Sequence, residues 1–348
     1  MTDPALALPG PDAAGLILRV LLGDAGTDPR GADWDVATGL AVRNGVVLRL
    51  AAALRRRGLT LPARLAAQAE RARLRADRIF GLVSQLGQAC ERHGLAHAFL
   101  AIAQHYPDAG KGIQLLVDGA AKAPDRAVLD HVPALPRSDR LRNRLAGATT
   151  YAVPAFDTTI TMHHGRLGSM GEHVDLAQLV LRGRHRARLG FFTAMAPSTE
   201  DQMLVQASQW TYGQTSMNLA EAFWTTAALR GGGIRWGTVL GAAEATGLLT
   251  ALSCHLGYVE QVYRAACGKE LLPADLRQRV EPGRWGRLEF KETGYTRPRA
   301  RISGPVYADQ LRSRIASGDW KAAGRLCLLP VLTIAHGLRR LISRRQGG

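Results

Sequence analysis

The chain is poor in cysteine, and its few cysteines lie far apart. Cys90, Cys254, Cys267 and Cys327 form no Cys-x-x-Cys pair. The sequence therefore predicts neither a zinc site of the usual spacing nor a disulfide framework. We expect all of them to be small, mostly buried side chains in a protein of the reducing cytoplasm.

Long apolar runs are also missing. No stretch reaches the roughly 18–20 apolar residues that a membrane-spanning helix requires. Residues 1–14 contain three prolines and no positively charged start, which argues against a secretion signal. We therefore expect a loose leader at the N-terminus.

Acidic residues are scarce relative to basic ones. The chain has 45 Lys plus Arg against 29 Asp plus Glu, a net charge of +16. Such a charge permits attraction to nucleic acid, to acidic proteins or to an anionic membrane surface. However, most of the basic residues are arginines in an Ala-, Gly- and Leu-rich background, which genome composition alone can produce. The charge therefore assigns no partner by itself.

Helical patterns dominate both ends of the chain. Asp33 is a typical helix start, and Pro62 begins a long amphipathic stretch that reaches His93. Ser198, followed three residues later by Asp201, resembles a capping box and starts a second helical region. The basic segment 338–345 has the pattern of a short amphipathic helix, which could lie on an anionic membrane or pack on the domain.

The centre of the chain has the pattern of a small sheet. Ile113 to Val117 is an apolar run between Gly112 and Asp118, short enough for a buried strand and too short for a helix. We predict further strands over 96–102 and 157–163, with a turn or short helix over 104–111.

These segments resemble a poorly characterised bacterial family of nucleotidyltransferase-fold proteins. Its motif runs Leu-Leu-Lys-Gly, Tyr-Pro, Arg, Asp-Ile-Asp-Leu-Leu-Val and a later Asp-Leu-His strand. The matching residues here are Phe99-Leu100-Ala101-Ile102, Tyr106-Pro107, Gly112-Ile113-Gln114-Leu115-Leu116-Val117 and Ile160-Thr161-Met162-His163. The resemblance covers roughly residues 30–280 and implies an α+β fold, with a small mixed sheet between helical regions.

On this basis we divide the chain into six parts. They are a loose leader (1–14), a helical N-terminal region (15–94), a nucleotidyltransferase-like core (95–197), a helical C-terminal region (198–280), a Pro-, Gly- and Arg-rich linker (281–305) and a basic C-terminal helical segment (306–348).

Compared with the family motif, this sequence keeps the apolar residues and lacks the ionic ones. Ala101 stands for the family's lysine, Gly112 and Gln114 for its paired aspartates, and Thr161 for its third carboxylate. Nucleotidyl transfer uses such carboxylates to hold two divalent ions roughly 3.5–4 Å apart. Asp118 and Asp157 each lie about 13 Å along the strand from the family's positions, too far to replace them. We therefore expect no metal-dependent nucleotidyl transfer and predict no cofactor.

The vacated cleft is the candidate site, and the resemblance implies Lys111, Gln114, Thr161 and His163 as its lining. Without carboxylates such a cleft is neutral to basic and could take an anionic or neutral polar ligand without metal. It could equally have collapsed, with neighbouring side chains filling it.

A metal site from His163, His164, His173 and Asp175 is an alternative with no diagnostic spacing. Adjacent His163 and His164 would point to opposite faces of a strand, so at most one of them could join such a site.

Three functions stay open. The chain could be a nucleotidyltransferase-like protein that lost its ancestral catalysis and binds a ligand, or runs another reaction, in a biosynthetic pathway. It could instead be an active transferase that uses unrecognised residues. It could also be a basic adaptor for nucleic acid or membrane, whose binding would weaken steeply with salt.

Overall fold

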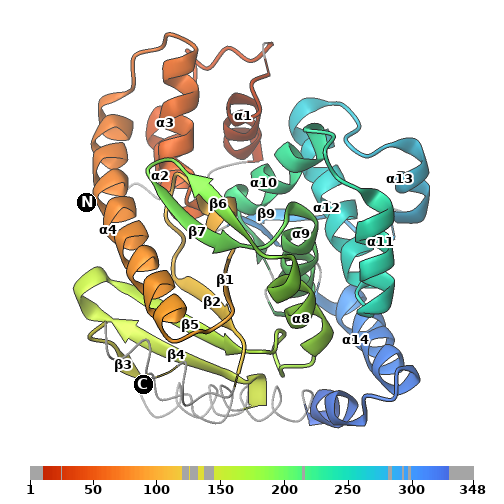
Figure 1. Ribbon diagram of the computed structural model, residues 1–348. Helices are drawn as coiled ribbons and strands as arrows, with labels where there is room; N and C mark the ends of the chain where they lie inside the picture. The colour runs from red at the N-terminus through yellow and green to blue at the C-terminus, as the bar shows by residue number, and fades with distance from the viewer. Residues whose placement is uncertain are drawn as a thin grey trace, which may run out of the picture.

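The computed structural model describes residues 11–24, 26–119, 125, 132–136, 145–213, 216–280, 284–291, 294–296 and 299–328. They form an α+β fold in which a mixed β-sheet is flanked by helices (Figure 1). The fold class predicted from the sequence is therefore confirmed. No helix in these ranges is both long enough and apolar enough to cross a membrane.

Helices form the N-terminal region, as predicted. They are α1 (Pro11–Leu21), α2 (Trp34–Asn44), α3 (Val47–Arg56) and α4 (Ala63–Arg92). Asp33 caps α2, because its side chain accepts the backbone N–H groups of Asp35 and Val36. The predicted loose leader, residues 1–14, is wrong for its last four residues, because α1 begins at Pro11. Ala14 is fully buried in a core that α1, α2 and α3 share with α12 (Leu249–Cys267), called the first core.

The central sheet contains the three predicted strands. They are β1 (His97–Leu100), β2 (Ile113–Val117) and β5 (Thr158–His164), joined by β3 (Leu135–Pro136) and β4 (Ala148–Val153). The strand order is β1-β2-β5-β4-β3. β2 and β5 run parallel, whereas the other neighbouring pairs are antiparallel. The predicted turn after β1 contains the short helix α5 (Ile102–His105).

Different helices cover the two faces of strands β1 and β2. Phe99, Ile113 and Leu115 pack in one core with residues of α4. Leu100 and Leu116 point the other way and pack with α8 (Val174–Gly183) and α9 (Thr199–Ser208). In Figure 1, α4 lies on one side of these strands, and α8 and α9 lie on the other. The hairpin of β6 (His185–Leu189) and β7 (Phe192–Ala196) packs in the same core as α4.

The C-terminal region is mostly helical. After α9 the chain continues as a π-helical turn, η2 (Gln209–Gly213), and a short strand, β8 (Ser216–Met217). The later helices are α10 (Leu219–Arg230), α11 (Trp236–Ala245), α12 (Leu249–Cys267), α13 (Ala274–Val280) and α14 (Arg299–Ala316). Ser198 caps α9 by accepting the N–H of Asp201, as predicted.

The linker predicted over 281–305 is wrong. It contains β9 (Glu289–Lys291) and β10 (Gly294–Thr296), which form a sheet with β8 in the order β8-β10-β9. Trp285 and Tyr295 are buried in the first core, so aromatic packing overrides the Pro- and Gly-rich composition. A Cβ at Gly294 would lie 2.3 Å from the backbone oxygen of Met217, so the strand pairing requires glycine there. The predicted basic helix over 338–345 lies outside the described residues.

Candidate functional site

Three of the four predicted site residues share one face of the sheet. In the parallel register of β2 and β5, Gln114 lies level with Thr161, and Leu116 lies level with His163. Because strand side chains alternate between faces, Gln114, Thr161 and His163 project to the same side. All three are half-buried. Together with Thr150 and Thr159, they are called the polar face below.

The polar face carries only neutral groups at neutral pH. Thr150 lies level with Thr161 across β4 and β5, and their hydroxyl oxygens are 3.4 Å apart. Among the residues that the structure describes, neither ring nitrogen of His163 has a hydrogen-bond partner. Burial, with a smaller contribution from His164, lowers the pKa of His163 to about 4. The imidazole is therefore uncharged at pH 7.

Lys111 lies elsewhere. It precedes β2 and lines a cavity of about 320 Å³ between α2, α4 and the loop 105–111, which does not include the polar face. The four residues predicted to line one cleft therefore do not lie together. The cation, Lys111, is separated from the three neutral residues.

Glutamines of the C-terminal region cover the end of β1 and the adjacent start of β2. Gln209 of η2 donates a hydrogen bond of 2.6 Å from its Nε2 to Oε1 of Gln114. Gln202 of α9 accepts the backbone N–H of Ala101 over 3.0 Å. Both contacts join neutral amide groups, so α9 and η2 are fixed on the sheet here by hydrogen bonds that involve no charged side chain.

A second glutamine of α9 belongs to a buried network. Gln206 donates to the backbone oxygen of Glu221 and accepts from the hydroxyl of Thr225. The hydroxyl of Thr225 also lies 3.2 Å from Nε2 of His255. Burial lowers the pKa of His255 to about 3 and raises that of Glu221 to about 7. The network therefore fixes α9, α10 and α12 with few charges.

The backbone turn after β1 has a conformation that glycine adopts most easily. Ala101 has a φ of 58°, in the left-handed region. Its N–H group, at the start of α5, is occupied by Gln202. A free N–H group at a helix start is the kind of donor that binds phosphate, and here a side chain of the same protein takes its place.

Gly112, which directly precedes β2, lies close to Thr159 of β5. A Cβ at this position would lie 2.7 Å from Oγ1 and 3.1 Å from the backbone oxygen of Thr159. The adjoining cavity, lined by Gly112, Gln114 and Ala101 among others, measures about 20 Å³. That volume holds about one water molecule, so this end of the site is closed to a larger ligand.

The candidate replacement carboxylates lie at opposite ends of the parallel pair. Asp118 follows β2, and Asp157 precedes β5. In the observed register they are separated along the strands by about 26 Å, at ~3.3 Å per residue. Both are exposed. They cannot hold one pair of metal ions together.

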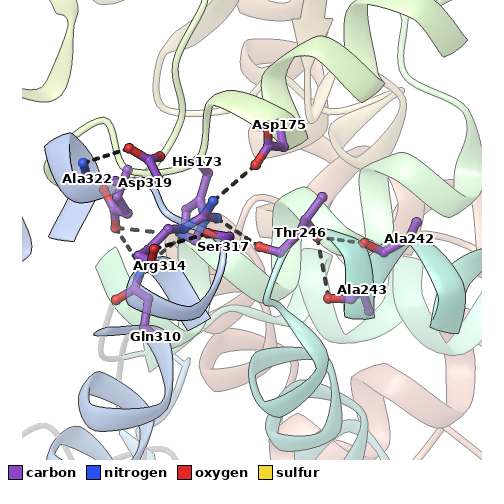
Figure 2. Close-up of polar contacts among 11 residues, drawn as sticks. His173, Asp175, Ala242, Ala243, Thr246, Gln310, Arg314, Ser317, Asp319 and Ala322 are labelled. Atoms are coloured by element: carbon purple, nitrogen blue, oxygen red, sulfur yellow. Dashed lines mark hydrogen bonds and ion pairs between the residues drawn. The ribbon is translucent and has the colours of Figure 1, made fainter. Parts of the chain in front are cut away.

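His173 belongs to a buried polar cluster that joins distant segments (Figure 2). Arg314 of α14 donates to Asp175 and to the backbone oxygen of Thr246, and its guanidinium lies 3.1 Å from Nδ1 of His173. The amide nitrogen of Gln310 lies 3.1 Å from Nε2 of the same ring. Burial lowers the pKa of His173 to about 4, which keeps the ring neutral.

This arrangement engages two of the four candidate ligands of the alternative metal site. Both nitrogens of His173 contact protein groups, and Asp175 is paired with Arg314. Within the described ranges, no group of three or more His, Cys, Asp or Glu side chains is placed to hold a metal ion.

A second buried pair, which the sequence reasoning missed, fixes the loop between α5 and β2. Asp108 accepts the backbone N–H groups of Leu48 and Arg49 at the start of α3. Arg49 in turn donates to the backbone oxygens of Gln104 and Tyr106. Burial raises the pKa of Asp108 to about 6 and lowers that of Arg49 to about 10.

The sequence held a signal for the glutamines but none for this pair. Gln202, Gln206 and Gln209 recur at helical spacing within an apolar segment, and such a pattern indicates polar side chains directed into a core. The partners of Asp108 lie about 60 residues earlier in the chain, so no local pattern reveals them.

Comparison with models of known protein families, with curated proteins and with solved structures found no match to this chain.

Proposed function

We propose that this chain is a nucleotidyltransferase-like protein that no longer performs metal-dependent nucleotidyl transfer, and that its polar face binds a neutral polar ligand. The observation that carries the proposal is the level pairing of Gln114 with Thr161 on parallel strands. The resemblance assigns these two positions to carboxylates that share metal ions. Positions with that role must lie side by side on one face, and these two do.

The geometry of the neighbouring groups supports the loss of catalysis. Gln114 offers a neutral amide that is already bonded to Gln209, and Gly112 has no room for a side chain beside Thr159. The turn at Ala101 supports the resemblance in another way, because its left-handed φ of 58° suits the glycine of a Lys-Gly pair. That placement would move the family's lysine to Leu100, which is also uncharged.

The ligand class follows from the chemistry of the polar face. Three threonine hydroxyls, one amide and one neutral imidazole donate and accept hydrogen bonds but supply no charge. Such groups suit hydroxyl- or amide-bearing molecules, and they leave a triphosphate–magnesium complex without ionic partners. The cavity beside Gly112 has room for about one water molecule, so we place binding further along β5, toward His163.

The first test is incubation of the protein with each labelled nucleoside triphosphate and magnesium or manganese. We expect no transfer of label to the protein or to added nucleoside and sugar acceptors. Robust transfer that disappears in Asp118→Asn or Asp157→Asn would contradict the proposal and support the active-transferase reading.

The second test follows the His163 ring by nuclear magnetic resonance while nucleosides and monosaccharides are added without metal. We expect its ring signals to shift with at least one of these neutral compounds in the wild type. The shift should disappear in Thr161→Val, which removes a hydroxyl at nearly constant volume. No shift with any compound would favour a collapsed face and overturn the binding part of the proposal.

A further inference from the structure

A basic cavity lies on the α4 side of the molecule, apart from the polar face. It measures about 320 Å³ and is bounded by the end of α2, the middle of α4 and the loop 105–111. Four cationic side chains line it: Arg43, Arg71, Arg75 and Lys111. They come from three segments that are distant in sequence, so the fold, rather than a local charge run, brings them together.

One acidic side chain, Asp108, lines the same cavity, but its carboxylate is already engaged. Its two oxygens accept the N–H groups of Leu48 and Arg49 at distances of 2.7 and 3.2 Å. The buried guanidinium of Arg49 adds positive charge behind it. The carboxylate therefore does little to offset the four cations that line the cavity.

The cations that line the cavity differ in whether their side chains are already hydrogen-bonded. Arg75 donates to the backbone oxygens of Ala109 and Gly110, which fixes the loop and its own guanidinium. Arg71 and Lys111 are exposed, and in the described part of the chain no hydrogen bond or ion pair engages either of them. Lys111 acts electrostatically on Glu221, which lies outside the cavity lining. Arg71 and Lys111 are thus available to an incoming anion.

The remaining walls suit the body of a small molecule. Val47 and Ala72 provide apolar surface, and Asn44, Gln68 and Asn218 provide amide groups. A volume near 300 Å³ is at the lower end of the range for small-molecule sites. Guanidinium groups bind phosphate oxygens through paired N–H donors, and a lysine adds a point charge.

We propose that the basic cavity is a binding site for a phosphomonoester of about mononucleotide size, whose phosphate contacts Arg71 and Lys111. The site is separate from the polar face, and the proposal does not depend on the nucleotidyltransferase resemblance. It requires no metal ion, because the protein supplies the positive charge.

Isothermal titration calorimetry tests this with three probes: adenosine 5′-monophosphate, glucose 6-phosphate and inorganic pyrophosphate. Adenosine and glucose are the uncharged counterparts. We expect sub-millimolar binding of at least one phosphomonoester in the presence of a chelator, and binding at least tenfold weaker for its uncharged counterpart. Absence of phosphomonoester binding, or equal binding of the uncharged compound, would overturn the proposal.

The variants Arg71→Ala and Lys111→Ala should each weaken phosphomonoester binding about tenfold. Arg56→Ala is the matched control, because it removes one exposed arginine, on α3, that does not line the cavity. The control should change binding less than twofold. Equal weakening by all three variants would show general attraction to a basic protein, and the proposal would fail.

Two further measurements separate this proposal from others. Thr161→Val on the polar face should leave phosphomonoester binding unchanged, so failure of either proposal can be recognised without the other. Titration with a single-stranded oligonucleotide tests the basic-adaptor reading. Tight oligonucleotide binding combined with no binding of small phosphates would overturn the cavity proposal in favour of that reading.

Discussion

The side-chain amide of Gln209 donates to the side-chain oxygen of Gln114 across 2.6 Å, and so joins η2 directly to β2. The two residues are 95 positions apart. Their contact fixes the start of the C-terminal helical region on the sheet. It also occupies, with neutral groups, the position at which the resemblance predicts a metal-binding carboxylate.

The Gln114–Gln209 bond should contribute about 1 kcal/mol to folding, as a partly buried neutral hydrogen bond does. Gln114→Ala, Gln209→Ala and the double variant form a double-mutant cycle. Urea unfolding should show that the double variant is less destabilised than the sum of the single variants by about 1 kcal/mol. Strict additivity would mean that the contact is not formed in solution.

Gly112→Ala should destabilise the protein by about 1–3 kcal/mol, because the added methyl group overpacks against β5. Thr159→Ala removes the nearer of the two opposing atoms and should restore part of the loss, since the backbone oxygen remains 3.1 Å away. The control is Gly81→Ala in α4, where nothing lies within 4 Å of the new Cβ. That change should stabilise the helix by about 0.5–1 kcal/mol. Equal effects at both positions would contradict the observed packing.

Arg314→Ala should destabilise the protein by about 1–3 kcal/mol, because its loss removes the donor that contacts His173 and the backbone oxygen of Thr246. Arg314→Lys should restore little of the lost stability, since a lysine ammonium group cannot contact Asp175, His173 and the backbone oxygen of Thr246 at once as the planar guanidinium does. Arg312→Ala is the control, because that side chain is 81% exposed and its removal should change stability by about 0.5 kcal/mol or less. Thermal unfolding measures all three. Full rescue by lysine would show that only the charge matters.

His163 should make folding sensitive to acid. Burial lowers the pKa of the folded ring from 6.5 to about 4, so the unfolded chain binds a proton at a higher pH than the folded protein does. The stability that this histidine contributes is fully present above pH 6.5 and is lost as the pH falls toward 4. The decrease in unfolding free energy between pH 7.5 and 4.5 should therefore be about 1–3 kcal/mol smaller in His163→Leu.

The control for this pH experiment is His185→Leu, which changes an exposed histidine on β6. Its pH dependence should match the wild type. His105 and His173, whose pKa values burial also lowers to about 4, keep part of the acid sensitivity in every variant. An unchanged slope in His163→Leu would show that its ring is hydrated in solution.

The strands were predictable where the local sequence decides the structure. The apolar run 113–117 is bounded by Gly112 and Asp118, and alternating β-branched residues mark β5. The helix starts at Asp33 and Ser198 were predictable for the same reason, since a cap interacts with residues two or three positions away.

Long-range contacts decided the rest. The hairpin of β9 and β10 forms because Trp285 and Tyr295 pack in a core built by distant helices, and no local pattern in that Pro- and Gly-rich segment shows this. The resemblance placed Lys111 in one cleft with Gln114, but Lys111 lines the basic cavity instead. The level pairing of Gln114 with Thr161 depends on the register between two strands, which the sequence alone does not define.

The close approach of Thr159 to Gly112 also has an evolutionary consequence. A carboxylate at position 112 needs space that the backbone and hydroxyl of Thr159 now occupy. If the proposed nucleotidyltransferase ancestry is right, regaining an acidic residue at position 112 requires a change in β5 as well, and that change brings no activity by itself. Under the same proposal, a single substitution at Gly112 would not restore the lost chemistry.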